Sequence, residues 1–162
     1  MSARRRHVEE IQVPPDDLEP LLQRMRELAA AHDGWVNLQP AVRDEDVPPP
    51  PRGLAILLGT PGPPVPVCTW VPGGAGRRGA APDQIGVQHG LGGRVLATLA
   101  EGGCPLPAGW RWRQDNPRRG LVVELPEATS PEDVVAWLMG AARLLSTVEL
   151  AGGWRAIVHH PG

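Results

Sequence analysis

The feature that most constrains the fold is residues 109–125, in which apolar and polar side chains alternate on both sides of a polar turn. Successive side chains of a β-strand point to opposite faces, so this alternation predicts two short antiparallel strands. The turn, residues 115–120, is built from Asp, Asn, Pro, Arg and Gly, and most of these types favour tight turns. Trp110 and Trp112 share the apolar face of the first strand, together with Gln114. We therefore expect both tryptophans to lie in the core.

The other face of this hairpin is rich in arginine. A guanidinium group can hold a carboxylate or a phosphate through two parallel hydrogen bonds, so a cluster of arginines is a candidate contact surface. The alternative, which is the default, is that these side chains are solvated and pair with Glu124, Asp115 or Glu127. The candidate surface-contact residues are Arg111, Arg113, Arg118 and Arg119.

Hydrophobic spacing elsewhere predicts an α+β fold with an antiparallel sheet. Apolar residues three and four positions apart indicate helices from about residue 16 to 34, from 91 to 101 and from 131 to 145, the last one capped by Ser130. Further strands are expected at 35–39, 54–58, 65–71, 85–88 and 154–159.

The order of these elements predicts the arrangement of the sheet. Over residues 65–159 the order βαββαβ is that of a ferredoxin-like fold, with both helices on one face and the hairpin as the central pair. The N-terminal helix and two extra strands, at 35–39 and 54–58, would precede this unit. We expect a flexible N-terminal tail over residues 1–14 and a single domain over 15–162.

The composition narrows the possible partners. The net charge of −2 argues against a general binder of polyanions, which usually has a basic excess. Nucleic acid binding is disfavoured further, because RNA-binding domains of ferredoxin-like order stack bases mostly on Phe and Tyr, and the chain has neither. All 16 basic residues are Arg. The absence of Lys, Tyr and Phe, whose codons are AT-rich, suggests a bacterial genome of high GC content.

The chain has no apolar stretch near the ~20 residues that a membrane helix needs. Its basic N-terminus is followed by acidic residues, not by the apolar run of a secretory signal. We therefore expect a soluble cytoplasmic protein with no membrane partner. Cys68 and Cys104 are expected to be reduced core residues, although a disulfide between them stays open. No spacing of ligands predicts a metal site, and no cofactor is predicted.

A glycine-rich turn before a helix is the second candidate site. Residues 88–94 would join a short strand to a helix N-terminus, where backbone N–H groups and the helix dipole favour an anion. The favoured alternative is that glycine lets the turn pack tightly. His89 could act as a base or an anion ligand, whereas a capping or surface histidine is favoured. The candidate anion-binding residues are Gln88, His89, Gly90, Gly92, Gly93 and Arg94.

Residues 90–96, Gly-Leu-Gly-Gly-Arg-Val-Leu, resemble the pyrophosphate loop of GNAT acyltransferases, in which Gly-x-Gly opens a helix that bears paired aliphatic residues. The resemblance covers about seven residues and implies binding of acyl-CoA at this turn. The chain departs from the family at Val87, where Gln or Arg is expected, and it has no tyrosine to match the family's downstream Tyr.

Two functions are left open by the sequence. No serine lies in a nucleophile motif and no paired carboxylates stand in an apolar setting, so no catalytic residue is predicted. The favoured function is a non-catalytic binding or assembly module that acts through a protein partner or through homodimerisation at a sheet edge. The alternative is a protein that binds a phosphate-bearing small molecule, CoA-like or nucleotide-like, or an acyltransferase-like enzyme, using residues 88–94.

Overall fold

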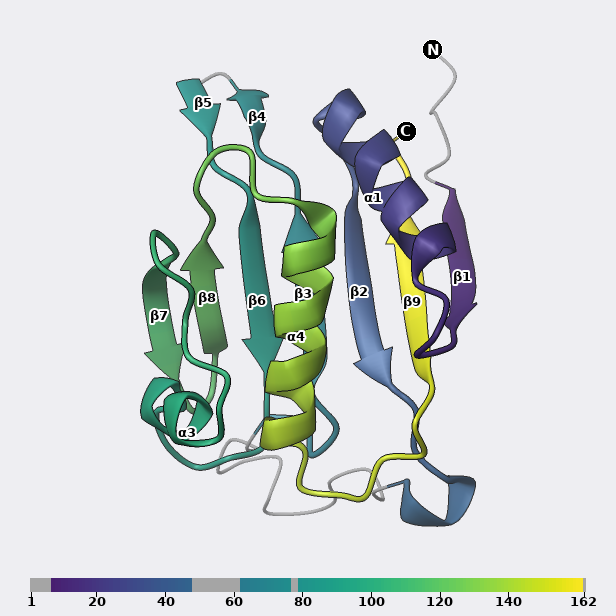
Figure 1. Ribbon diagram of the computed structural model, residues 1–162, viewed down its shortest axis with the longest axis vertical. Helices are drawn as coiled ribbons and strands as arrows, with labels where there is room; N and C mark the ends of the chain where they lie inside the picture. Colours follow the sequence, from purple (N-terminus) through teal and green to yellow (C-terminus); the bar gives the residue numbers. More distant parts are fainter. Residues whose placement is uncertain (1–6, 48–61, 77–78, 162) are drawn as a thin grey trace.

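The protein is an α+β domain built on one seven-stranded antiparallel sheet (Figure 1). The computed structural model describes residues 7–47, 62–76 and 79–161. The strands lie in the order β1-β9-β2-β3-β6-β8-β7, and every neighbouring pair is antiparallel. They are β1 (Val8–Val13), β2 (Trp35–Pro40), β3 (Val67–Val71), β6 (Gln84–Gln88), β7 (Arg111–Asn116), β8 (Gly120–Glu124) and β9 (Trp154–His159).

Among the described residues, three helices cover one face of this sheet, and no helix lies on the other, which we call the open face (Figure 1). They are α1 (Glu19–Ala31), α3 (Leu96–Glu101) and α4 (Pro131–Leu145). The predicted start of α4 is confirmed, because the Ser130 hydroxyl accepts a hydrogen bond from the Asp133 N–H at 3.2 Å. Two small elements lie outside the layers. The ribbon β4–β5 (Gly74–Gly76 and Gly79–Ala81) extends the β3–β6 hairpin, and the short 3-10 helix η1 (Asp44–Asp46) follows β2.

The core lies between the sheet and its helices. Alternate residues of each central strand point into it, and the opposite residues face the open side. Leu21, Met25 and Leu28 of α1 meet the sheet at helical spacing and are at most 1% exposed. Leu138 and Leu145 of α4 also meet the sheet, nearer its centre, and are at most 2% exposed. The helical stripes that the sequence predicts are therefore the faces that stabilise the domain.

The ferredoxin-like order is not confirmed. After β3 the chain turns back as β6, which pairs antiparallel with β3 before the first crossover helix begins. The hairpin β7–β8 is thereby moved outward: β8 pairs with β6, and β7 is the last strand of the sheet. The expectation that this hairpin is the central pair is wrong, because a sequence pattern shows which strands are amphipathic but not which strands become neighbours.

The N-terminal residues also differ from expectation. Residues 8–13, expected within a flexible tail, form β1 and pair along their length with β9. Because Glu9 and Glu10 are adjacent charged residues, the sequence here lacks the clear alternation of polar and apolar residues that is typical of a strand. Glu9 lies on the helix-covered side, where Arg24 Nε and His160 Nε2 each approach its carboxylate at 2.9 Å. These contacts lower the pKa of Glu9 against the opposing effect of burial. The strand expected at 54–58 lies outside the described residues.

Candidate functional site

β7 is one of the two edge strands of the seven-stranded sheet, the other being β1. Among the described residues no strand lies beyond β7, so its backbone groups on that side have no strand partner. Trp112 lies on this strand and is 57% exposed, whereas Trp70, Trp110, Trp137 and Trp154 are at most 9% exposed. A sheet edge that carries an exposed tryptophan offers both backbone hydrogen-bonding groups and a large apolar surface.

A β-bulge determines which side chains of β7 point to each face of the sheet. Trp112 pairs with Val123 and Gln114 pairs with Val122, so Arg113 is an extra residue between them. Gln114 is thereby moved to the open face, where its amide donates to the backbone carbonyl of Arg119 at 3.1 Å. The expectation that Gln114 shares the tryptophan face is wrong, since period-two counting fails across a bulge.

The two hairpin tryptophans have different environments. Trp110 precedes the strand and packs at 5.6 Å against the ring of Trp137, whose indole N–H donates to the Pro105 carbonyl. Its predicted place in the core is confirmed. The same prediction for Trp112 is wrong. Trp112 faces the helix-covered side. Because β7 is the outermost strand, a neighbouring strand, β8, flanks Trp112 on one side only, and the side chain stays exposed.

Arg111 and Arg113 lie on β7, whereas Arg118 and Arg119 lie in the turn between β7 and β8, and the four differ in their partners. Arg113 forms an ion pair with Glu124 at 2.7 Å, and this contact lowers the pKa of Glu124. Arg111 pairs opposite Glu124 across the strands and adds to the same effect. Within the described ranges, no carboxylate lies within ion-pair distance of Arg111, Arg118 or Arg119. These guanidinium groups remain available to a ligand.

The glycine-rich turn is closed to anions at its helix end by a carboxylate from the hairpin. Asp115 accepts hydrogen bonds from the Val95 N–H at 2.9 Å and the Leu96 N–H at 3.2 Å, at the start of α3. These N–H groups directly follow the predicted anion-binding residues 88–94. Gly92 and Gly93 lie in open space, and Arg94 is exposed. The hairpin therefore brings a carboxylate to the turn.

The two polar residues at the end of β6 point to opposite faces. Gln88 is exposed on the open face of the sheet, whereas His89 is 1% exposed on the core side. Residues 62–64 pack directly on the backbone of 89–90, since a Cβ on Gly62 would lie 1.9 Å from the His89 carbonyl. The structure does not bring Gln88 and His89 together, and the favoured expectation of a surface or capping histidine is wrong for His89.

His89 is buried without a hydrogen-bond partner. Within the described part of the chain, neither ring nitrogen makes a hydrogen bond, and no other buried side chain has an unpartnered nitrogen or oxygen. Burial lowers the pKa of His89, while the charge of Asp115 and the backbone of Leu91 act in the opposite direction. The Leu91 backbone is near enough to have this influence without meeting hydrogen-bond geometry. The lowered pKa therefore favours the neutral form of the ring at neutral pH.

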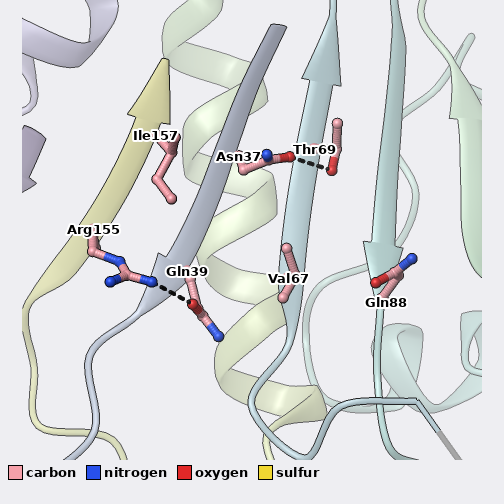
Figure 2. Close-up of a pocket in the computed structure, with 7 residues that line it drawn as sticks. All are labelled: Asn37, Gln39, Val67, Thr69, Gln88, Arg155 and Ile157. Atoms are coloured by element: carbon pink, nitrogen blue, oxygen red, sulfur yellow. Dashed lines mark hydrogen bonds between the residues drawn. The ribbon is translucent and has the colours of Figure 1, made fainter. Parts of the chain in front are cut away.

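A hollow of about 330 Å³ lies on the open face, over β9, β2, β3 and β6 (Figure 2). Sequence reasoning did not find it, because its residues come from four strands whose neighbours the sequence does not reveal. Arg155 lies at one side and donates to the Gln39 side-chain carbonyl at 3.4 Å. The lining residues are Asn37, Gln39, Val67, Thr69, Gln88, Arg155 and Ile157.

The polar side chains that line the hollow differ in how many hydrogen bonds they already make. Asn37 accepts from the Thr69 hydroxyl at 3.0 Å and donates to His159 Nε2 at 3.1 Å, and the His159 ring stacks on Trp35. Gln88 makes no side-chain hydrogen bond among the described residues, and Arg155 has only a distant second contact, at 3.9 Å, with Glu10. The hollow therefore offers a cation and an amide beside the aliphatic Val67 and Ile157.

Both cysteines are free thiols. Burial raises the pKa of Cys68 to about 12 and also raises that of Cys104. Both are therefore poor nucleophiles near neutral pH, because the thiolate is the reactive form. Nowhere in the described ranges do three or more His, Cys, Asp or Glu side chains gather as they would around a metal ion.

Among the helices of the described chain, none combines the length and the apolar character needed to cross a membrane. Comparison with protein-family models, with curated protein sequences and with solved structures gave no match.

Proposed function

We propose that the protein is a non-catalytic binding module that takes an extended segment of a protein partner at the outer edge of β7. The observation that carries this proposal is the 57% exposure of Trp112 between two arginines on an edge strand. Tryptophan and arginine are the residue types most enriched where protein interfaces gain their binding energy. An added strand gains affinity from backbone hydrogen bonds and specificity from alternate side chains.

The rest of the fold supports this edge as a rigid platform. β8 is held on its other side by β6, and the buried Leu121 and Val123 anchor it to the core. Asp115 ties the second half of β7 to the start of α3. A partner segment would therefore meet a preformed strand, so that little of the binding energy is lost in ordering the protein.

Hydrogen–deuterium exchange with three capped eight-residue peptides tests the proposal. The peptides alternate valine with glutamate, threonine or lysine, and at least one should slow exchange of the β7 backbone amides. Trp112→Thr should weaken that binding about tenfold or more, because it removes an interfacial anchor but keeps strand propensity. Val71→Thr is the matched control, since Val71 is also exposed on a strand, at 42%. Unchanged exchange at β7 with all three peptides would contradict the proposal.

A second candidate function, favoured by the hollow, is the binding of a small carboxylate on the open face. Arg155 would hold the carboxylate, the Gln88 amide would add a hydrogen bond, and Val67 and Ile157 would contact an apolar body. This candidate differs from a phosphate-bearing ligand at residues 88–94, for which Asp115 already occupies the Val95 and Leu96 N–H groups.

Titration with hexanoate, hexanol and inorganic phosphate separates these ligands. Hexanoate should shift the NMR signals of the Gln39 and Gln88 side-chain amides, and hexanol should not. Arg155→Gln should abolish the shift, whereas Arg43→Gln, which changes an arginine 59% exposed near η1, should leave it unchanged. If phosphate instead shifts the backbone amides of residues 90–94 and hexanoate shifts nothing, the ligand site is at the turn.

A further inference from the structure

The charge and the faces of β7 together specify the chemistry of its partner. Residues 111–124 contain four arginines and two carboxylates, a net charge of +2 in a chain whose net charge is −2. One of the two carboxylates, Asp115, is directed to the N–H groups of α3, and the other, Glu124, is paired with Arg113. The edge is therefore a basic surface on an acidic protein.

The two faces of an added strand would meet different neighbours. Arg111 lies on the open face opposite Glu124, and Arg113 reaches the same carboxylate from the bulge. Trp112 lies on the helix-covered side. Directly opposed side chains on neighbouring strands are about 5 Å apart, so each side chain of an added strand would contact only one of these two environments.

We infer that the β7 edge binds an extended acidic segment in which carboxylates alternate with apolar residues. The carboxylates face Arg111 on the open side, beside the Arg113–Glu124 ion pair, and the apolar residues cover Trp112 on the other. The turn arginines, Arg118 and Arg119, meet further acidic residues at one end of the segment. This inference rests on the proposed function and adds to it the charge and the pattern of the partner.

A protein segment fits this edge better than a nucleic acid does. A peptide backbone can pair with the outer N–H and C=O groups of β7, which a sugar–phosphate chain cannot do in register. Within the described ranges the edge has a single exposed tryptophan and no row of aromatic platforms on which successive bases would stack.

The test compares capped eight-residue peptides that differ in charge or in pattern. The peptide in which glutamate and valine alternate should bind. The peptide in which lysine and valine alternate, and a blocked peptide of four glutamates followed by four valines, should bind at least about tenfold more weakly. Binding is measured by titration calorimetry together with exchange protection of the β7 amides. Affinity should fall as salt rises from about 50 to 500 mM, since the contacts are exposed ion pairs.

Substitutions at Arg111 test whether the β7 edge selects an acidic partner over a basic one. Arg111→Gln should weaken binding of the alternating glutamate–valine peptide about fivefold. Arg111→Glu should lower this affinity further and strengthen binding of the alternating lysine–valine peptide. Arg43→Gln is the matched control and should change neither affinity. Circular dichroism and the unfolding midpoint of each variant check that the fold is intact.

The outcomes separate this inference from the function on which it rests. If the threonine–valine or lysine–valine peptide protects β7 as well as the glutamate–valine peptide does, the edge binds segments but the acidic pattern is wrong. If no peptide protects β7, both proposals fail, and the arginines and the bulge keep the edge from pairing. Tighter binding of an eight-nucleotide single-stranded RNA, or a β7 edge already paired in a homodimer, would also overturn the inference.

Discussion

Replacing Gly120 by alanine is expected to lower the free energy of unfolding by about 3 kcal/mol. Gly120 begins β8 with φ +82°, a left-handed conformation that is costly for a residue with a Cβ. A Cβ at this position would also lie 2.5 Å from the Val87 carbonyl oxygen of β6. Because that neighbour is backbone, the two strands themselves must move apart.

Chemical denaturation gives the size of this effect, and Gly92→Ala is its control. Gly92 has no heavy atom within 4 Å of an added Cβ, and its φ is not positive. The control variant should therefore stay within about 0.5 kcal/mol of the unmodified protein. Gly120→Ala should also increase hydrogen exchange in β7 and β8 first, since the clash lies between β6 and β8. Equal stability of the two variants would show that β8 does not approach β6 as closely as described.

Replacing His89 by leucine is expected to stabilise the protein by about 1 kcal/mol at pH 7.5. The ring is 1% exposed and neither of its nitrogens has a hydrogen-bond partner among the described residues, so removing the polar atoms relieves a desolvation penalty. Leucine is close in size and keeps the apolar contacts of the site. Thermal or chemical unfolding of the two proteins measures the difference.

The stabilisation from His89→Leu should increase as the pH falls. Burial lowers the pKa of His89 in the folded state below the value of about 6.5 expected in the unfolded chain. Above about pH 6.5 the ring is neutral in both states, and its titration does not affect stability. Below this pH the unfolded chain binds a proton that the folded chain does not, so the unmodified protein loses stability until the pH reaches the folded-state pKa.

The pH experiment compares differences between proteins, because Glu9 also has a lowered pKa and loses its stabilising contribution in more acidic solution. The difference in free energy of unfolding between His89→Leu and the unmodified protein should be larger at pH 5.5 than at pH 7.5. His7→Gln, which changes an exposed histidine before β1, should not reproduce this widening. A gap that stays constant over this range would mean that His89 is solvated or partnered in solution.

Local sequence patterns predicted α1, α4 and most strands well, but α3 begins at Leu96 and not at residue 91 as expected. The apolar stripe that includes Leu21, Met25 and Leu28 lies in α1, and the Ser130 cap begins α4, as their spacing and residue types indicate. These features depend on residues within one or two turns of each other, so they can be recognised without the rest of the chain. The strand β1 was missed because its carboxylate Glu9 is stabilised by residues distant in sequence, Arg24 and His160.

The candidate sites were predicted less well than the fold. The arginines of the β7–β8 hairpin were recognised, but the exposure of Trp112 was not, since it depends on β7 being the last strand of the sheet. The glycine-rich turn suggested an anion, whereas a carboxylate from 20 residues away, Asp115, meets the Val95 N–H. The hollow on the open face gave no sequence signal, because its residues come from four strands.

The sequence by itself determined the amphipathic elements, the hairpin at 109–125 and its basic charge. These follow from side-chain periodicity and turn chemistry, which act over a few residues. Only the tertiary structure decided that this hairpin lies at the edge, that Trp112 is exposed and that His89 is buried without a partner. The physical reason is that pairing between strands distant in sequence selects which amphipathic surface is covered. That pairing leaves Trp112 and Arg111 at the edge, where a partner can contact them.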